Sequence, residues 1–204
     1  MTRNPKNPAI GGGSKPNPTG ITTSVSTLSL VEGTGSDILV NIEPSSADQN
    51  IVFTTSSASI ASISEAGTSD GKKKFRVNGV SSGTATITFT SKQDSSIKKT
   101  VSVTVKKPAP TGITVDKEVL NLTTGESGDL NLNVTPANAV QEVSGSTADT
   151  SIARISPQGL VDGKIKYTVN SLKAGSTTIT FSVKEDTSKK VTVTVNVTDP
   201  IAED

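Results

Sequence analysis

The chain has 204 residues, of which 20 are basic and 19 acidic, so its formal net charge is +1 at pH 7. It contains neither cysteine nor histidine, which excludes disulfides, thiol chemistry and Ser-His-Asp or Cys-His catalysis. Basic residues do not gather into a broad stripe, and four phenylalanines and one tyrosine are the only aromatic residues, so nucleic-acid binding is not indicated.

The N-terminal residues 1–17 differ in composition from everything that follows. They are rich in proline, asparagine and glycine and poor in large apolar side chains. Such a segment cannot bury enough apolar surface to offset the entropy lost on ordering, so residues 1–17 are predicted to form a flexible N-terminal arm. Its basic residues Arg3, Lys6 and Lys15 are candidate docking contacts.

The arm carries no recognisable targeting or nucleotide-binding signal. Residues 11–15, Gly-Gly-Gly-Ser-Lys, lack the GxxxxGK[ST] spacing of a phosphate-binding loop. No apolar stretch follows the charged start, as a secretory signal would require, and no run approaches the roughly 20 apolar residues of a membrane span. We therefore expect no membrane insertion, and either a complete chain made in the cytosol or one whose export signal has been removed.

A long internal repeat follows the arm. The sequence Pro-Thr-Gly-Ile-Thr at residues 18–22 returns 92 residues later at 110–114, and the same offset aligns the rest of the two copies without a gap. A repeat of this length matches one sandwich domain rather than a solenoid unit. The sequence predicts domain 1 over residues 18–108, domain 2 over 109–200 and a C-terminal tail over 201–204, with a proline-containing linker at 106–110.

Within each copy, apolar and polar residues alternate with a period of two. Residues 101–105 and 191–197 place valine at every second position, as expected for strands with one buried face. Asp70-Gly71 and Asp162-Gly163 suit tight hairpin turns. About seven short strands in each copy predict an all-β fold of two tandem immunoglobulin-like β-sandwich domains. The predicted core residues are Ile21, Leu28, Leu30, Ile60, Ile87, Phe89, Val101 and Val103 in domain 1, and Ile113, Leu120, Leu122, Ile152, Ile179, Phe181, Val193 and Val195 in domain 2.

No constellation for catalysis, cofactor binding or metal binding emerges, so the chain is predicted not to be an enzyme. A carboxylate pair could hydrolyse glycosidic bonds, but the glutamates fall at expected turns or exposed strand positions, and a sugar cleft with aromatic platforms is not indicated. Four aspartates recur between the copies: Asp37 with Asp129, and Asp70 with Asp162. Turn chemistry accounts for them more simply than calcium binding, which needs six or more converging oxygens.

The repeated units resemble the bacterial Ig-like group 2 domain over nearly all of residues 18–200. The resemblance rests on the opening Gly-Ile-Thr, the Leu-x-Leu followed by glycine, the alternation ending at Pro44 or Pro136, the Ser-Ile-Ala segment and the late glycine before Thr-Ile-Thr-Phe. Members of the family usually carry a core tryptophan where this chain has Phe53 in the first copy and Gly145 in the second. The second core is therefore expected to be looser around Gly145.

The resemblance implies a spacer, adhesion or decoration role, as in bacterial surface adhesins and in structural proteins of tailed bacteriophages. We expect a virion accessory protein that docks through its arm on other virion structural proteins of the capsid, neck or tail. Present in many copies on this larger assembly, it would make weak contacts with host cell-surface glycans. The alternative is a fragment of a secreted, intimin- or invasin-like adhesin at the bacterial cell surface, and a carbohydrate-binding module of an enzyme is a weaker third possibility. Fold alone does not choose between these roles.

Overall fold

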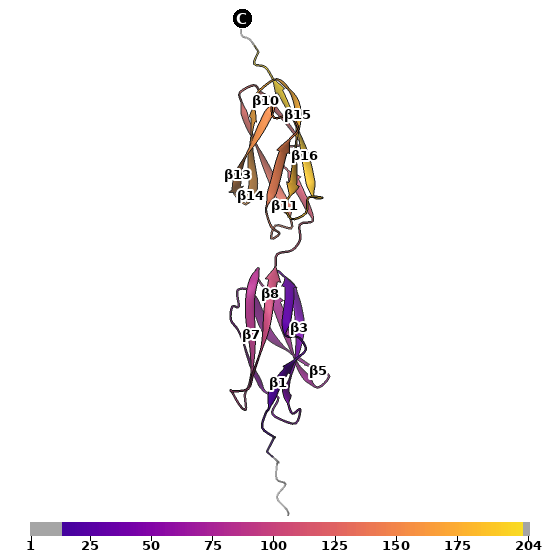
Figure 1. Cartoon of the computed structure of the whole chain (residues 1–204), viewed down its shortest axis with the longest axis vertical. Helices are drawn as coiled ribbons and strands as arrows, with labels where there is room; N and C mark the ends of the chain where they lie inside the picture. The colour runs from indigo at the N-terminus through magenta and orange to yellow at the C-terminus, as the bar shows by residue number, and fades with distance from the viewer. Residues whose placement is uncertain (1–13, 202–204) are drawn as a thin grey trace, which may run out of the picture. The chain divides into compact units, whose positions relative to one another are not determined.

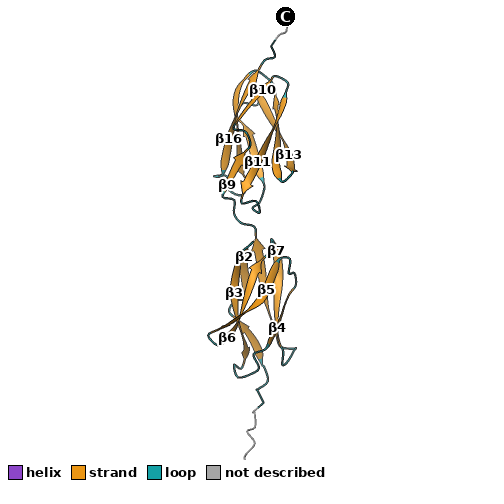
Figure 2. Cartoon of the chain, turned by 180° about the vertical axis from the view of Figure 1, so that it is seen from behind, coloured by secondary structure: helices purple, strands orange, loops and turns teal. Residues whose placement is uncertain are grey.

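The computed structural model describes residues 14–201, which form sixteen β-strands and no helix (Figure 2). The chain divides between Lys106 and Lys107 into two compact units, called domain 1 and domain 2 below. Each domain is a sandwich of two four-stranded sheets. The predicted all-β fold with two tandem immunoglobulin-like domains is confirmed. Residues 1–13, including the candidate contacts Arg3 and Lys6, and residues 202–204 lie outside the described residues.

Domain 1 contains strands β1 to β8 (Figure 1). One sheet has the order β1-β3-β6-β5 and the other has the order β2-β8-β7-β4. All neighbouring strands are antiparallel except β2 and β8, which run parallel. The strands are β1 Gly20–Thr23, β2 Thr27–Val31, β3 Gly35–Glu43, β4 Ile51–Thr55, β5 Ala61–Ser69, β6 Lys72–Gly79, β7 Gly83–Ser91 and β8 Lys98–Lys106.

Domain 2 repeats this topology with strands β9 to β16. Its sheets have the orders β9-β11-β14-β13 and β10-β16-β15-β12, and β10 and β16 form the parallel pair. The strands are β9 Gly112–Val115, β10 Val119–Thr123, β11 Ser127–Thr135, β12 Val143–Thr147, β13 Ala153–Val161, β14 Lys164–Ser171, β15 Gly175–Val183 and β16 Lys190–Thr198.

Each described domain has eight strands rather than the seven or so predicted, because the first strand is divided. β1 pairs with β3 in one sheet. After residues 24–26 the chain continues as β2, which pairs with β8 in the opposite sheet. The sequence marks this break by a change of phase, since the apolar residues Ile21 and Val25 lie at odd positions and Leu28 and Leu30 at even ones.

The two cores consist of the inward residues of the facing sheets. In β3 the inward residues Ile38, Val40 and Ile42 are completely buried, as the period of two requires. All the predicted core residues belong to the two cores. Most of them are buried, while Leu28, Ile60 and Ile152 are partly buried and pack against the core.

The two predicted hairpin turns are confirmed. Asp70 and Gly71 join β5 to β6 with φ values of 50° and 72°, and Asp162 and Gly163 join β13 to β14 with 49° and 75°. Two successive residues with positive φ give the turn whose twist matches the flanking strands, and aspartate and glycine tolerate that backbone. The turn role predicted for Asp37 and Asp129 is wrong, because both lie within strands, β3 and β11.

The looser packing predicted around Gly145 is also wrong. In domain 1 the ring of Phe53 contacts Phe75, with the centroids 5.0 Å apart. In domain 2 other side chains fill the matching space: a Cβ atom on Gly145 would lie 2.6 Å from Ile155 Cδ1 and 2.8 Å from Phe181 Cε1. The second core therefore compensates for the missing ring by closing over the glycine backbone.

Candidate functional site

Two broad classes of site find no support in the described residues. Residues 14–201 contain no group of three or more His, Cys, Asp or Glu side chains that could hold a metal ion. In the same part of the chain, no helix is long and apolar enough to cross a membrane.

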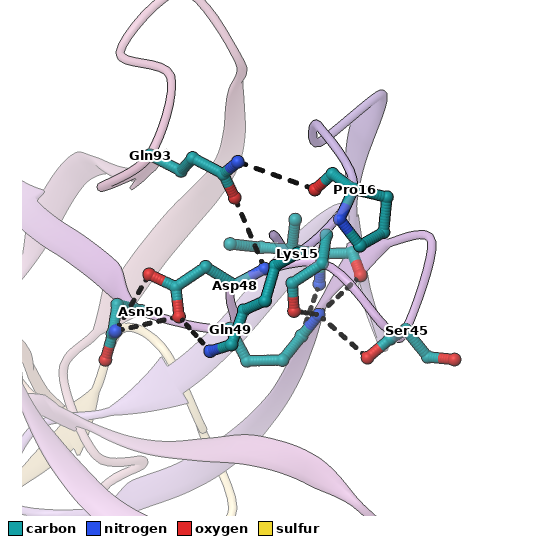
Figure 3. A network of polar contacts seen from close by, with 9 residues as sticks. Lys15, Pro16, Ser45, Asp48, Gln49, Asn50 and Gln93 are labelled. Carbon is teal, nitrogen blue, oxygen red and sulfur yellow. Dashed lines mark hydrogen bonds and ion pairs between the residues drawn. The ribbon is translucent and has the colours of Figure 1, made fainter. Parts of the chain in front are cut away.

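The N-terminal end of domain 1 carries a polar network that receives the end of the arm (Figure 3). Lys15 Nζ lies 2.8 Å from Asp48 Oδ1, and Asn50 Nδ2 donates to both carboxylate oxygens of Asp48 at 2.9 Å. Gln93 Nε2 donates to the carbonyl oxygen of Pro16 at 3.5 Å, and Gln93 Oε1 accepts from Asp48 N at 3.3 Å. Residues from the arm, the β3–β4 connection and the β7–β8 connection thus meet at one end of the sandwich.

This network borders an open hollow of about 560 Å³, which Ser14 and Lys92 also line. The hydrogen bond from Lys15, followed by the one from Asn50, holds the pKa of the Asp48 carboxyl below its usual range. The Lys15 side chain is 61% exposed, so water and salt screen the pair and its contribution to stability is small. The contact orients residues 14–17 but does not lock them in place. Of the three candidate docking residues, Lys15 is the one within the described residues.

A glutamine side chain organises the β3–β4 connection at the same end (Figure 3). Gln49 Oε1 accepts from Ile42 N at 2.9 Å, and Gln49 Nε2 donates to Ile42 O at 2.8 Å and to Ala47 O at 3.3 Å. The amide replaces a strand partner for the buried backbone of Ile42. Gln141 makes the equivalent bonds to both backbone groups of Val134 in domain 2. Sequence reasoning missed this pair, although its recurrence at the repeat offset was an available signal.

The recurring aspartates Asp37 and Asp129 serve ion pairs across neighbouring strands. Asp37 on β3 lies 3.1 Å from Arg76 Nη1 on β6. Asp129 on β11 lies 2.7 Å from Lys166 Nζ on β14 and accepts a 2.8 Å hydrogen bond from Thr168 Oγ1. The bonds from Lys166 and Thr168 lower the pKa of Asp129. Charge is therefore concentrated on the outer face of this sheet in each domain.

Three further aspartates close tight turns. The pKa values of their carboxyl groups predict how the stability of the protein depends on pH. Asp94, Asp149 and Asp186 each accept hydrogen bonds from the backbone N and the Oγ of the serine two residues later. In all three, the serine hydroxyl followed by the serine backbone N–H lowers the pKa of the carboxyl. A lowered folded-state pKa means that the stabilisation is complete above the unfolded pKa of about 3.9 and is lost as the pH falls through the folded value.

We therefore expect the thermal midpoint to be nearly constant from pH 7 to about pH 5 and to fall below about pH 4. Replacing Asp94, Asp149 and Asp186 by asparagine keeps an acceptor oxygen but removes the titration. This triple variant should lose less of its midpoint between pH 5 and pH 3 than the parent, as differential scanning calorimetry would measure. An equal fall of the thermal midpoint between pH 5 and pH 3 in both proteins would contradict this account.

Comparison with known families agrees with this architecture. The sequence profile of the bacterial Ig-like domain (group 2) family matches residues 18–105 and again residues 109–195. The chain belongs to this family. Each matched segment of this group 2 protein coincides with one sandwich, so the family resemblance inferred from the repeat is confirmed. No curated protein matches the chain.

Among solved structures, the adhesin InvE of Yersinia pseudotuberculosis matches 92% of this group 2 protein and 61% of its own chain, with 13% identity and a TM-score of 0.50. Domains 4 and 5 of the S-layer protein SbsC match 72% of this chain and 75% of that chain, with 25% identity and a TM-score of 0.40. The Escherichia coli adhesin FdeC matches 87% of this chain and 63% of that chain at 10% identity, with a TM-score of 0.40. The likeness to InvE is a likeness of fold.

Proposed function

We propose that this chain is a non-enzymatic structural protein that decorates the virion of a tailed phage. In this proposal residues 1–17 dock on the capsid, neck or tail, and the two Ig-like domains are displayed on the particle surface. Many copies on one particle would convert weak contacts with host-surface glycans into attachment.

The path of the chain through each domain is the observation that supports display. In domain 1 the residues before β1 lie at the end of the sandwich where β3 finishes, since Thr19 N donates to Glu43 O at 2.7 Å. β8 finishes at the opposite end, where Lys106 O accepts from Glu32 N at 2.9 Å, close to the start of β3 (Figure 1). The nine residues of β3 span roughly 30 Å.

Domain 2 follows the same path, because Thr111 N donates to Thr135 O at the end of β11 and Thr124 N donates to Thr198 O near its start. Each domain therefore carries the chain from one of its ends to the other. A domain with this path lengthens a projecting structure, whereas one with both termini at the same end would not. The architecture suits a spacer that holds a surface away from an anchor.

The test compares the full chain with a version that lacks residues 1–17 and with the full-length variant in which Arg3, Lys6 and Lys15 are replaced by serine. Each is mixed with purified phage particles and, separately, with host cells, and bound protein is measured after sedimentation. We expect the full chain to bind particles, the truncated chain to lose that binding, and the serine variant to bind at least several-fold less.

The second candidate is a surface module of a bacterial adhesin, and the same assay separates it from the first. An adhesin fragment would bind cells with or without residues 1–17 and would not bind particles in any form. That outcome would overturn the virion proposal and would identify the arm as a spacer.

A further inference from the structure

The two sheets of domain 2 differ sharply in the charge of their outer faces. The sheet β9-β11-β14-β13 carries the ion pair between Asp129 and Lys166. On the opposite sheet, the central outward positions are hydroxyl residues, as in the cross-strand pairs of Thr178 with Thr194 and of Thr180 with Thr192. No acidic residue occurs within β10, β12, β15 or β16. Apart from exposed Lys190 at the start of β16, the second face is therefore a neutral hydrogen-bonding surface.

Domain 1 does not share this neutrality. Its matching sheet β2-β8-β7-β4 carries exposed Lys98 and Lys106 on β8, and Lys106 stands where domain 2 has Thr198. Thr84 corresponds to Ser176, Thr90 to Ser182 and Ser102 to Thr194. The hydroxyl rows of the central strands are therefore common to both domains, whereas the uncharged residue at Thr198 is specific to domain 2.

A hollow of about 220 Å³ interrupts the neutral face of domain 2, beside the parallel strands β10 and β16. Its lining consists of Asn121, Leu122, Thr123, Glu126, Asn196 and Thr198. The hollow is smaller than the roughly 300 Å³ at which drug-sized pockets begin, so it suits one small ring rather than a larger ligand.

The two asparagines of the hollow are oriented by a short relay. Ser176 Oγ donates to Asn196 Oδ1 at 2.9 Å, and Asn196 Nδ2 donates to Asn121 Oδ1 at 3.0 Å. Among the described residues, the amide nitrogen of Asn121 has no acceptor, and Asn121 is exposed. The relay fixes the Asn121 amide in an orientation that leaves its two N–H donors available to a ligand.

We propose that this hollow binds one ring of a neutral polysaccharide, whose neighbouring sugars lie along the threonine rows of β15 and β16. Sugar hydroxyls donate and accept hydrogen bonds, which matches a lining of amides and hydroxyls. The central face offers no cation to hold an anionic polymer, and the Glu126 carboxylate in the lining can accept hydrogen bonds from sugar hydroxyls but would repel an anionic polymer. This inference rests on the proposed function, because without an aromatic platform each contact is weak and display in many copies must supply the avidity.

Domain 1 provides the variants for the test, because it has Ser29 and Thr104 where domain 2 has Asn121 and Asn196. The double variant Asn121→Ser with Asn196→Thr removes the paired amides but places residues that the same register already accommodates. Asn133→Thr, at an exposed position on the opposite sheet, is the matched control. Thermal unfolding of all three proteins checks that the sandwich is intact.

The full chain is coupled in many copies to beads, and the beads are tested for retention on immobilised dextran, mannan and galactan, with polygalacturonate as the anionic arm. We expect retention on at least one neutral polymer, about tenfold weaker retention for the double variant because two amide contacts are lost, and unchanged retention for Asn133→Thr. Deleting residues 1–17 should leave retention unchanged, so this result is independent of particle docking.

Three results would overturn the inference. These are no retention of the parent on any neutral polymer, equal retention of the double variant, or retention on polygalacturonate alone. Loss of particle binding by the truncated chain together with absent polysaccharide binding would leave the virion proposal standing and would eliminate only this site.

Discussion

Replacing Gly145 by phenylalanine, the residue at the matching position of domain 1, should destabilise domain 2 rather than complete its core. Ile155 and the ring of Phe181 already occupy the space beside the glycine, at 2.6 Å and 2.8 Å from an added Cβ atom. Even Gly145→Ala should cost about 2 kcal/mol, as overpacking of a well-filled core typically does. Phenylalanine should cost more, because its ring requires both neighbours to move.

Without these contacts, the same change in a strand should be slightly favourable. Alanine restricts the unfolded chain and is ordinarily about 0.5–1 kcal/mol better than glycine inside a strand. Gly112 in β9 is the matched control, since a Cβ atom there would meet nothing within 4 Å. Gly112→Ala should therefore leave domain 2 unchanged or slightly stabilised.

Calorimetry of the full chain, with hydrogen exchange to report each domain separately, would measure both variants. A loss of about 2 kcal/mol corresponds to a midpoint lower by roughly 8–16 °C for a domain of this size. Domain 1 should be unaffected. If Gly145→Ala proved neutral, the space beside Gly145 would be open and the predicted loose core would be restored.

The second large effect is expected from the glutamines that bind the buried backbone of β3 and β11. Gln49→Ala would leave the N–H and C=O groups of Ile42, which is completely buried, without their side-chain partners. Unsatisfied buried groups cost about 1–3 kcal/mol each, so a loss of about 2–4 kcal/mol from domain 1 is expected. Gln141→Ala should have the same effect on domain 2 through Val134.

Gln49→Glu makes this test sharper. At pH 7 the carboxylate would face the carbonyl oxygens of Ile42 and Ala47, which now accept hydrogen bonds from Gln49 Nε2. A protonated glutamic acid can donate one of those bonds, so the defect should shrink as the pH falls through the raised pKa of the introduced group. Urea denaturation at pH 7 and pH 5 measures the difference. A defect that is independent of pH would show that shape, not hydrogen bonding, is what the glutamine supplies.

Features that arise from a local sequence pattern, or from a pattern present in both copies, could be predicted from the sequence. Contacts between segments distant in sequence could not. Alternation revealed the strands and cores, and the recurring Asp-Gly pairs revealed the hairpins. The contact between Lys15 and Asp48 was not predictable in this way, because it joins connections distant in sequence, and the position matching Asp48 in domain 2 is Val140. The hollow at Asn121 and Asn196 was equally inaccessible, since it depends on which strands are parallel neighbours.

The absence of a ring at Gly145 was visible in the sequence, but its consequence was not. A missing side chain suggests empty space only if the surroundings stay fixed. The branched side chain of Ile155 and the ring of Phe181 instead take the vacated position, as expected when a core fills its volume by repacking. A residue that differs between the two copies therefore indicates that the core side chains are arranged differently, not that they are packed less densely.

The parallel pairing of β2 with β8 also determines how domain 1 would respond to tension. The chain approaches β2 from one end of the sandwich and leaves β8 at the other, so a pull along the chain slides these strands past each other. The bonds between Thr27–Val31 and Ser102–Lys106 would then share the load and would have to break together rather than in succession. Domain 2 has the same arrangement in β10 and β16. Each sandwich should therefore resist a pull applied along the chain through the shear of its parallel strand pair.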